Sequence, residues 1–416
     1  MKKDLFITFL TQVLVLICGL LVYRAANQQL GYEGFAIYAL CRRTNSFLFP
    51  ALAVGCSVAI PRYIAFSRTK NKQMSDSYFK GGMFIVSITV FIFTLIVNMF
   101  PEVAAKLLFS NSKYSNLAAP ISMMMVGYML HSISYAYYRG HTRMVACNLL
   151  QIINIAIIPV VAAYTTKTPE AMLGWTGVGW VFTGGCVFAM SILPKLTGSL
   201  SCMSLKEVFV FGIQRMPSDF GFATLFGLPA TLTAHSAGVI AGGHVAFGIS
   251  LLNMCGSVFG PIGLVLLPRA SAAIACNDSA FINKYIKLAL IGTSVLSFTI
   301  FLIFEFAAEP ILKLYLGSNL SPSLVSTTRI VMLASVPYSI YVASRSMIDA
   351  FFVIGINTIN VLLALGLFMI LVNCTKLEFN YAVSPLSALV ASLFLLTTAT
   401  LMTCYYIVRN NKTNLH

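Results

Sequence analysis

Long apolar runs separated by short polar segments make up almost the whole chain. A membrane-spanning helix needs about 20 predominantly apolar residues, and continuous rather than alternating runs indicate helices instead of a barrel. The pattern therefore predicts an all-α polytopic membrane protein with about twelve transmembrane helices. Their expected limits are 4–26, 35–62, 80–100, 118–138, 144–164, 172–194, 205–232, 239–268, 284–306, 325–348, 352–373 and 382–408.

The 27 Lys and Arg residues are distributed unevenly over the polar segments. Cytoplasmic loops of membrane proteins carry an excess of basic residues, and with the N-terminus placed in the cytoplasm the inner segments hold most of them. Both termini are therefore expected in the cytoplasm. The first apolar run, from Leu5 to Val22, is too long for a signal-peptide core and is expected to be the first span. The outer segments hold only Lys106, Lys113, Lys167, Lys313 and Lys376.

Composition supports the membrane assignment and narrows the chemistry. Of the 416 residues, 58% are hydrophobic and only 9% are charged, whereas a soluble domain has about 25% charged residues. The net charge of +15 is explained by basic loops and does not call for nucleic acid. The ten cysteines form no CxxC pair, and neither GxxxxGK(S/T) nor HExxH occurs. We therefore expect no enzyme, nucleotide site or metal cofactor, and an H⁺ or Na⁺ gradient is the candidate energy source.

A polar segment, residues 195–206, divides the chain into residues 1–194 and residues 207–416, each with six expected spans. The two halves match at nearly equal offsets, although chance similarity between apolar helices is an alternative explanation. Because six spans return the chain to the same side of the membrane, the repeats are expected to run in parallel. An offset of 207 pairs Pro61 and Arg62 with Pro268 and Arg269, and an offset of 206 pairs Arg139 and Asn154 with Arg345 and Asn360.

Arg42 and Arg43 lie within an expected span, where each guanidinium costs about 2.5–3.5 kcal/mol on insertion scales. Arginine stays charged in proteins, so the pair must reach the head groups or face a wet cavity that holds an anion. Tyr38, Arg42, Asn45 and Ser46 are spaced i, i+4, i+7 and i+8 and share one helix face, which predicts a cavity-lining helix. Arg43 points about 100° away, so it either lines a cavity or extends to the interface.

Arg215 and Asp219 form a second intramembrane candidate, because residues i and i+4 lie on one helix face. Pro217 between them removes a backbone hydrogen bond and favours a kink. Arg215 is a candidate for substrate binding and Asp219 for ion coupling, and the alternative is a purely structural ion pair. Arg24, at the outer end of the first span, is either a further cavity residue or an interfacial anchor.

Uncharged polar residues also form stripes on the fourth and fifth spans. Hydroxyl and amide groups inside membranes commonly hydrogen-bond neighbouring helices. Tyrosines and amides also suit sugar surfaces, through ring stacking and hydrogen bonds to hydroxyls, so both interpretations stay open. The stripes are Tyr128, His131, Ser134, Tyr135 and Tyr138 on the fourth span, and Asn148, Gln151 and Asn154 on the fifth.

Taken together, these features resemble the polysaccharide-exporter branch of the multidrug/oligosaccharidyl-lipid/polysaccharide (MOP) flippase superfamily, and in particular the O-antigen flippases of the Wzx type. The resemblance covers nearly the whole chain and rests on twelve spans in two sets of six and on short motifs. These motifs are the run from Leu30 through Phe35 to Tyr38, Ile60-Pro61-Arg62, and Arg139 with Asn154.

The resemblance implies a MATE-like fold, with two six-helix lobes around a central cavity and alternating access. It also implies a bacterial inner membrane, an undecaprenyl-diphosphate-linked oligosaccharide as substrate, and a glycan polymerase and a chain-length regulator as partners. Arg42, Arg215, Arg24 and Arg43 would then hold the diphosphate and sugars, because arginine suits phosphate oxygens, with Tyr38 and Asn45 beside them.

The main alternative within the same superfamily is an ion-coupled multidrug exporter of the MATE type. Such exporters bind organic cations and commonly use acids inside the membrane. Here the first span has no acid between Asp4 and Glu33, and the charge inside the membrane is net positive. Both facts argue against export of organic cations.

Overall fold

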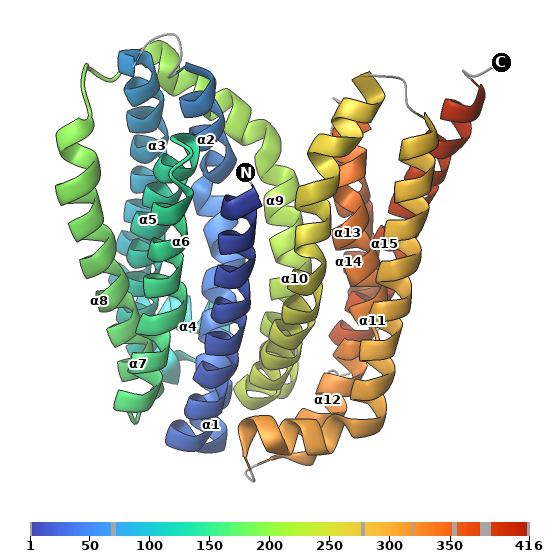
Figure 1. Ribbon diagram of the computed structural model, residues 1–416. Helices are drawn as coiled ribbons and strands as arrows, with labels where there is room; N and C mark the ends of the chain where they lie inside the picture. The colour runs from blue at the N-terminus through green and yellow to red at the C-terminus, as the bar shows by residue number, and fades with distance from the viewer. Residues whose placement is uncertain are drawn as a thin grey trace.

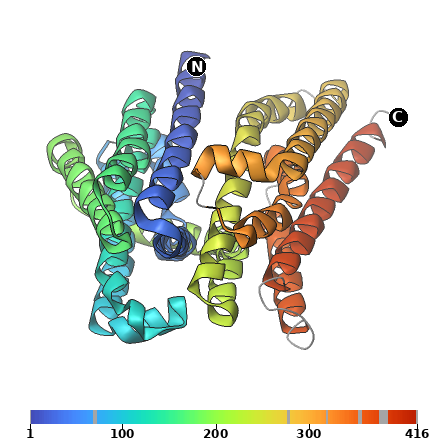
Figure 2. The same cartoon turned by 90° about the horizontal axis from the view of Figure 1, so that it is seen from below.

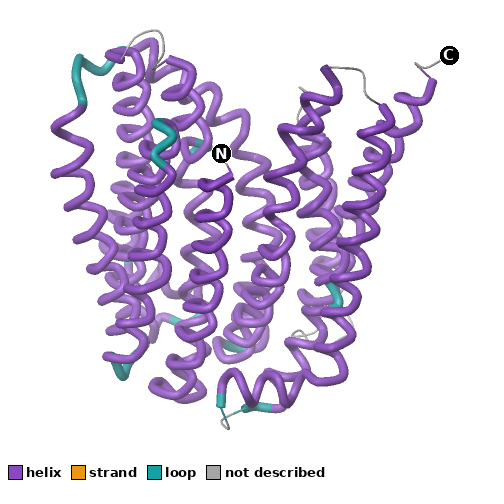
Figure 3. Tube along the Cα trace, in the orientation of Figure 1, coloured by secondary structure: helices purple, strands orange, loops and turns teal. Residues whose placement is uncertain are grey.

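The computed structural model describes residues 2–67, 72–275, 279–317, 320–351, 356–374 and 384–413, and all regular structure within these residues is helical (Figure 3). Nine helical stretches of the described chain are long and apolar enough to cross a membrane. The first of them, Phe6–Ala53, covers most of the two expected spans 4–26 and 35–62. The prediction of an all-α polytopic membrane protein is confirmed.

The helices form two bundles that lie side by side, with α9 between them (Figures 1 and 2). The N-terminal bundle consists of α1 (Lys2–Ala53), α2 (Cys56–Ser67), α3 (Lys72–Met99), α4 (Pro101–Phe109), α5 (Ala118–Gly140), α6 (Met144–Gln151), α7 (Ile158–Thr165) and α8 (Pro169–Val187). The linking helix is α9 (Cys202–Ala237). The C-terminal bundle consists of α10 (Val239–Ala275), α11 (Ser279–Leu316), α12 (Pro322–Met332), α13 (Ser335–Phe351), α14 (Ile356–Cys374) and α15 (Ser384–Thr413).

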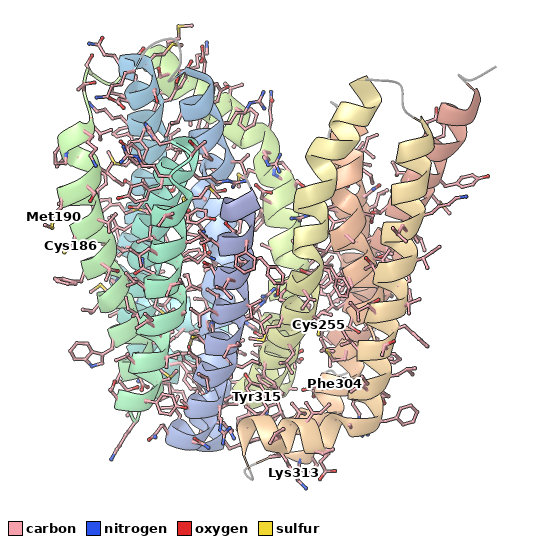
Figure 4. The ribbon with its side chains drawn as sticks, viewed as in Figure 1. Cys186, Met190, Cys255, Phe304, Lys313 and Tyr315 are labelled. Atoms are coloured by element: carbon pink, nitrogen blue, oxygen red, sulfur yellow. The ribbon has the colours of Figure 1, made fainter. Side chains whose placement is uncertain are left out.

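Large apolar side chains cover the outside of both bundles. Phe182, Met190, Phe306 and Leu314 are 70–84% exposed, and Met190 points away from α8 (Figure 4). An apolar surface of this kind is stable when it faces lipid rather than water. The exposed faces therefore agree with a multi-pass membrane protein.

The long helix α1 is a hairpin of two antiparallel arms. Gly31 lies at φ 65° and ψ −170°, a left-handed conformation that glycine adopts without steric cost. The turn brings Tyr23 of the first arm within 6.2 Å of Tyr38 of the second, measured between ring centroids. On a straight helix, residues 15 apart would be separated by roughly 22 Å. The expected spans at 4–26 and 35–62 begin on these two arms.

The second expected span, 35–62, is not one continuous helix. It breaks at Val54 and Gly55, both with positive φ, before α2 begins. The break lies against α9, where a Cβ added at Gly212 would approach the Val54 carbonyl oxygen to 2.2 Å. The crossing therefore requires glycine both at the break and on α9, which apolar periodicity could not reveal.

The parallel repeat appears in the positions of the helix ends. The turn between α9 and α10 lies at Gly238, which has positive φ like Gly31, 207 residues earlier. Likewise α4 ends at Ser110 and α11 at Gly317, both in positive φ and again 207 residues apart. Helix α4 was not predicted, because it is only nine residues long. Its counterpart is the last turns of α11, beyond the irregular backbone at Ala307.

Polar contacts close the two bundles against each other at the end that carries these glycine turns. Asn27 Nδ2 donates to the Leu316 carbonyl at 3.0 Å, and the Tyr32 hydroxyl donates to Ser321 Oγ at 3.3 Å. Tyr315 lies at the same junction (Figure 4). At the opposite end, toward which both chain termini lie, the bundles diverge (Figure 1).

The segment between α8 and α9 is attached to the start of α3. The Asp76 carboxylate accepts hydrogen bonds of 2.9 Å from both the backbone nitrogen and the hydroxyl of Thr197. The backbone nitrogen of Ser201 donates to Ser77 Oγ at 2.9 Å, and Lys80 donates to the Gly198 carbonyl. These contacts fix the segment to the N-terminal bundle.

Candidate functional site

Four residues of the predicted polar stripe on the second arm of α1 line one cavity of about 400 Å³. They are Tyr38, Arg42, Asn45 and Ser46. We call this space the N-bundle cavity, because α5, the α6–α7 segment and α8 form its other walls. Those walls include Tyr128, His131, Ser132, Tyr135, Gln151, Ile155, Pro159, Thr176 and Trp180.

A second cavity of about 260 Å³ lies between α1 and α10, and we call it the inter-bundle cavity. Tyr23, Arg42 and Arg43 line it from α1, and Ser250 and Asn253 line it from α10. Arg42 lines both cavities and so stands between them. Among the described residues, no Asp or Glu lines either cavity. The two spaces therefore share one unneutralised positive charge.

Arg42 has unused hydrogen-bonding capacity. Its Nη1 atom is buried and has no hydrogen-bond partner. Its guanidinium carbon lies 5.1 Å from the centre of the Tyr23 ring, a cation–π contact that stabilises the charge only in part. A buried donor without a partner costs free energy comparable to a lost hydrogen bond. An anionic ligand in these cavities would remove that cost.

Arg43 is held to the linking helix. Its Nε atom donates to the Phe226 carbonyl at 3.0 Å, and its guanidinium carbon lies 5.6 Å from the Phe226 ring centre. In this conformation Arg43 lines the inter-bundle cavity.

Asn45 combines a weak contact with a free acceptor. Its Nδ2 atom lies 3.6 Å from Met124 Sδ, and its Oδ1 atom is buried without a hydrogen-bond partner. The N-bundle cavity therefore offers an acceptor at Asn45 close to the donor at Arg42. Such a pair suits a ligand that has both kinds of group.

The remaining candidates lie elsewhere. Arg215 Nε is 3.7 Å from Asp219 Oδ2, and their side chains are 48% and 33% exposed. Arg24 is exposed, and these three residues line neither of the two cavities. Helix α9 continues through Pro217 without a break. The expected joint cavity of Arg42 and Arg215 is not what this conformation shows.

Sequence reasoning missed the wall that α10 contributes. Ser250, Asn253 and Ser257 line the inter-bundle cavity, and the Tyr23 hydroxyl hydrogen-bonds Ser250 Oγ at 2.8 Å. The spacing i, i+3 and i+7 in an otherwise apolar span was the available signal. Trp180 was also missed, because a single aromatic residue in an apolar span carries no pattern.

Comparison with known proteins identifies a family from the sequence and similar structures from the fold. A family described as polysaccharide biosynthesis protein matches residues 1–274, which is more than half of the chain. No curated protein sequence matches. Structural similarity extends over nearly the whole chain, at sequence identities that are informative about the fold alone.

One similar structure is the inward-facing conformation of a multidrug resistance MATE family transporter of the MOP superfamily. Its TM-score is 0.77 at 13% identity, with 97% of this chain and 96% of that chain covered. The lipid II flippase MurJ in an inward closed conformation has a TM-score of 0.72 at 14% identity, with 99% and 88% covered. An outward-facing MATE family transporter has a TM-score of 0.60 at 13% identity, with 99% and 97% covered. The expectation of a MATE-like fold is confirmed.

Proposed function

Because the chain belongs to the polysaccharide biosynthesis protein family, we propose that it is a flippase for an undecaprenyl-diphosphate-linked oligosaccharide. The cargo would be an O-antigen or similar surface-polysaccharide repeat unit. The protein would carry it from the cytoplasmic to the outer leaflet of a bacterial inner membrane by alternating access. A glycan polymerase and a chain-length regulator would then act on the product.

The observation that carries this proposal is the unpaired, buried guanidinium nitrogen of Arg42. Its buried Nη1 has no partner, Arg43 lies in the same inter-bundle cavity, and no described acid lines it. Two adjacent guanidinium groups suit the oxygens of a diphosphate, because charge-assisted and bidentate hydrogen bonds to phosphate are strong. A lipid-linked diphosphate is the anionic substrate that the resemblance to O-antigen flippases implies.

The alternative is an ion-coupled multidrug exporter of the MATE type, whose fold the chain shares. An organic cation would need an acid or an electron-rich cage to compensate its charge. The described lining of both cavities has Arg42 instead of an acid. This electrostatic mismatch favours the anionic lipid-linked substrate.

Replacement of Arg42 tests the proposal. We expect Arg42→Ala to abolish surface delivery of the glycan at normal protein levels, and Arg42→Lys to retain part of it because the charge remains. Arg143→Ala, which removes an exposed arginine, serves as the matched control and should transport normally. Normal glycan delivery by Arg42→Ala would overturn the proposal.

Asp219 is the candidate for coupling to an H⁺ or Na⁺ gradient. Its partner Arg215 lies 3.7 Å away, so proton or sodium binding would compete with this ion pair. We expect Asp219→Asn to lose the dependence of transport on the ion gradient, whereas Glu102→Gln, at an exposed acid of α4, should keep it. An unchanged ion dependence in Asp219→Asn would remove Asp219 from the mechanism.

A further inference from the structure

The N-bundle cavity is a space that the binding of a diphosphate does not by itself use. All the residues that line it belong to the N-terminal bundle, so it is a side chamber rather than part of the inter-bundle space. Its volume of about 400 Å³ falls within the usual range of small-molecule sites, roughly 300–1,000 Å³. Its lining shows which chemistry it would bind.

One wall of the chamber is a continuous row of rings from α8 and α5. Trp180 lies 5.8 Å from Tyr128, Tyr128 stacks on His131 at 6.0 Å and 21°, and Tyr135 continues the row 6.0 Å beyond His131. Aromatic side chains offer large flat faces with polar groups at their edges. The C–H face of a sugar ring fits such a wall.

A buried network fixes the orientation of these rings. Asn154 Nδ2 donates to His131 Nδ1 at 3.1 Å, the Thr183 hydroxyl donates to Asn154 Oδ1, and the Trp180 indole N–H donates to the Asn154 carbonyl. Because an amide nitrogen only donates, His131 Nδ1 accepts, and the neutral imidazole has its proton on Nε2. Asn154 lies in the π-helical turn Ile152–Ile157, a feature frequent at functional sites.

Donors and acceptors are mixed around the chamber. Arg42 Nη1 is a buried donor without a partner, and Asn45 Oδ1 is a buried acceptor without one. The Gln151 amide, which can do both, also lines the chamber. A phosphate would use only the donors, whereas each sugar hydroxyl both donates and accepts. The polar groups therefore match a polyhydroxylated ring better than a second phosphate.

We propose that the N-bundle cavity binds the sugar residue that is attached directly to the lipid diphosphate. This inference rests on the proposed function. Arg42 lines both cavities, so one ligand can place its diphosphate beside Arg42 and Arg43 and its first sugar against Trp180, Tyr128 and His131. The chamber then selects for the first sugar, and the arginines hold the diphosphate that every such substrate shares.

The chain carries its own fluorescent reporter for this chamber. It has two tryptophans: Trp175 is 64% exposed, and Trp180 is 8% exposed and lines the chamber. Trp175→Phe leaves Trp180 as the single tryptophan. The purified variant in lipid nanodiscs is titrated with undecaprenyl diphosphate and with undecaprenyl diphosphate carrying one N-acetylhexosamine. Radiolabelled lipid gives the affinity, and Trp180 emission reports on the chamber.

We expect both lipids to bind, but only the sugar-bearing lipid to change Trp180 emission. The sugar should tighten binding by about tenfold, the equivalent of one or two good contacts. Gln151→Ala, which lies outside the His131–Asn154 network, and His131→Ala should each remove most of that difference without weakening the bare diphosphate. Gln29→Ala, at an exposed glutamine of α1, is the matched control and should leave both affinities unchanged.

Two results would overturn the inference in different ways. Equal affinities of the two lipids, with unchanged Trp180 emission and no effect of Gln151→Ala, would exclude the sugar site and leave the diphosphate site intact. Failure of both lipids to bind would remove the proposed function together with the sugar site.

Discussion

Arg42 and Arg43 are adjacent in the sequence but have different partners, because successive helix residues point about 100° apart. Arg43 donates to the Phe226 carbonyl of α9, so it attaches the second arm of α1 to the linking helix. Arg42 keeps Nη1 buried without a partner. Arg43 therefore contributes to the fold as well as to the inter-bundle cavity, whereas Arg42 keeps an unpaired donor for a ligand.

Alanine substitutions should separate these two roles. Arg43→Ala removes a hydrogen bond from a charged donor, which contributes about 1.5–3 kcal/mol, so its midpoint of thermal unfolding in detergent should fall by several degrees. Arg42→Ala removes an incompletely paired buried charge, so its midpoint should stay equal or rise. The two variants are each other's control, and an equal loss of stability in both would contradict the division of roles.

Helical periodicity predicted the face of α1 that carries Tyr38, Arg42 and Asn45, because a face depends only on spacing within one helix. It did not predict which helix lies opposite. Arg215 was expected across a cavity from Arg42, yet it lies beside Asp219 outside both cavities. The N-bundle cavity, too, depends on how four helical segments cross. Residue spacing along the sequence does not show how helices cross.

The crossing of the α1–α2 break with α9 depends on two glycines in contact. A Cβ at Gly212 would lie 2.2 Å from the Val54 carbonyl oxygen, and a Cβ at Gly55 would lie 2.5 Å from the Gly212 carbonyl oxygen. Both neighbours are backbone atoms, so neither can move aside cheaply. The close approach allows α9 to lie against the N-terminal bundle.

Gly212→Ala should therefore destabilise the protein, whereas alanine at an open helical glycine should not. Overpacking of a tight contact costs about 1–3 kcal/mol. Gly174 of α8 has no atom within 4 Å of an added Cβ, and Gly→Ala inside a helix contributes about 0.5–1 kcal/mol of stability. Thermal unfolding of both variants measures the difference. If Gly212→Ala were as stable as Gly174→Ala, α9 would not approach the backbone at Val54 and Gly55 this closely.

At the scale of elements, long apolar runs predicted the helices well, because burial in lipid demands about 20 apolar residues per span. Shorter elements were not predicted from the apolar runs. Helix α4 has nine residues, and the break at Val54 and Gly55 is a two-residue turn that packs against Gly212 of α9. The π-helical turn at Ile152–Ile157 likewise accompanies a contact between helices, the hydrogen bond from Trp180 to Asn154.

The two bundles are bonded to each other at one end, which we call the closed end, and they diverge at the other, which we call the open end (Figure 1). Gly31 and Gly238, 207 residues apart and both at positive φ, form equivalent turns at the closed end, where Asn27 and Tyr32 bond the C-terminal bundle. With the termini in the cytoplasm, as the charge pattern predicts, the open end would face the cytoplasm.

The closed end depends on Gly243 of α10, where an added Cβ would lie 2.4 Å from both the Cα and the carbonyl oxygen of Ala36. A valine there should force α1 and α10 apart and shift the population toward the conformation that is open at this end. Hydrogen exchange followed by mass spectrometry should then be faster in residues 24–36 and 238–247. It should be slower in residues 12–19, because this part of α1 lines the inter-bundle cavity and would become covered.

Gly292→Val, at an open position of α11, is the control. Faster exchange throughout Gly243→Val would show simple loss of stability, and the predicted switch between two states would be wrong.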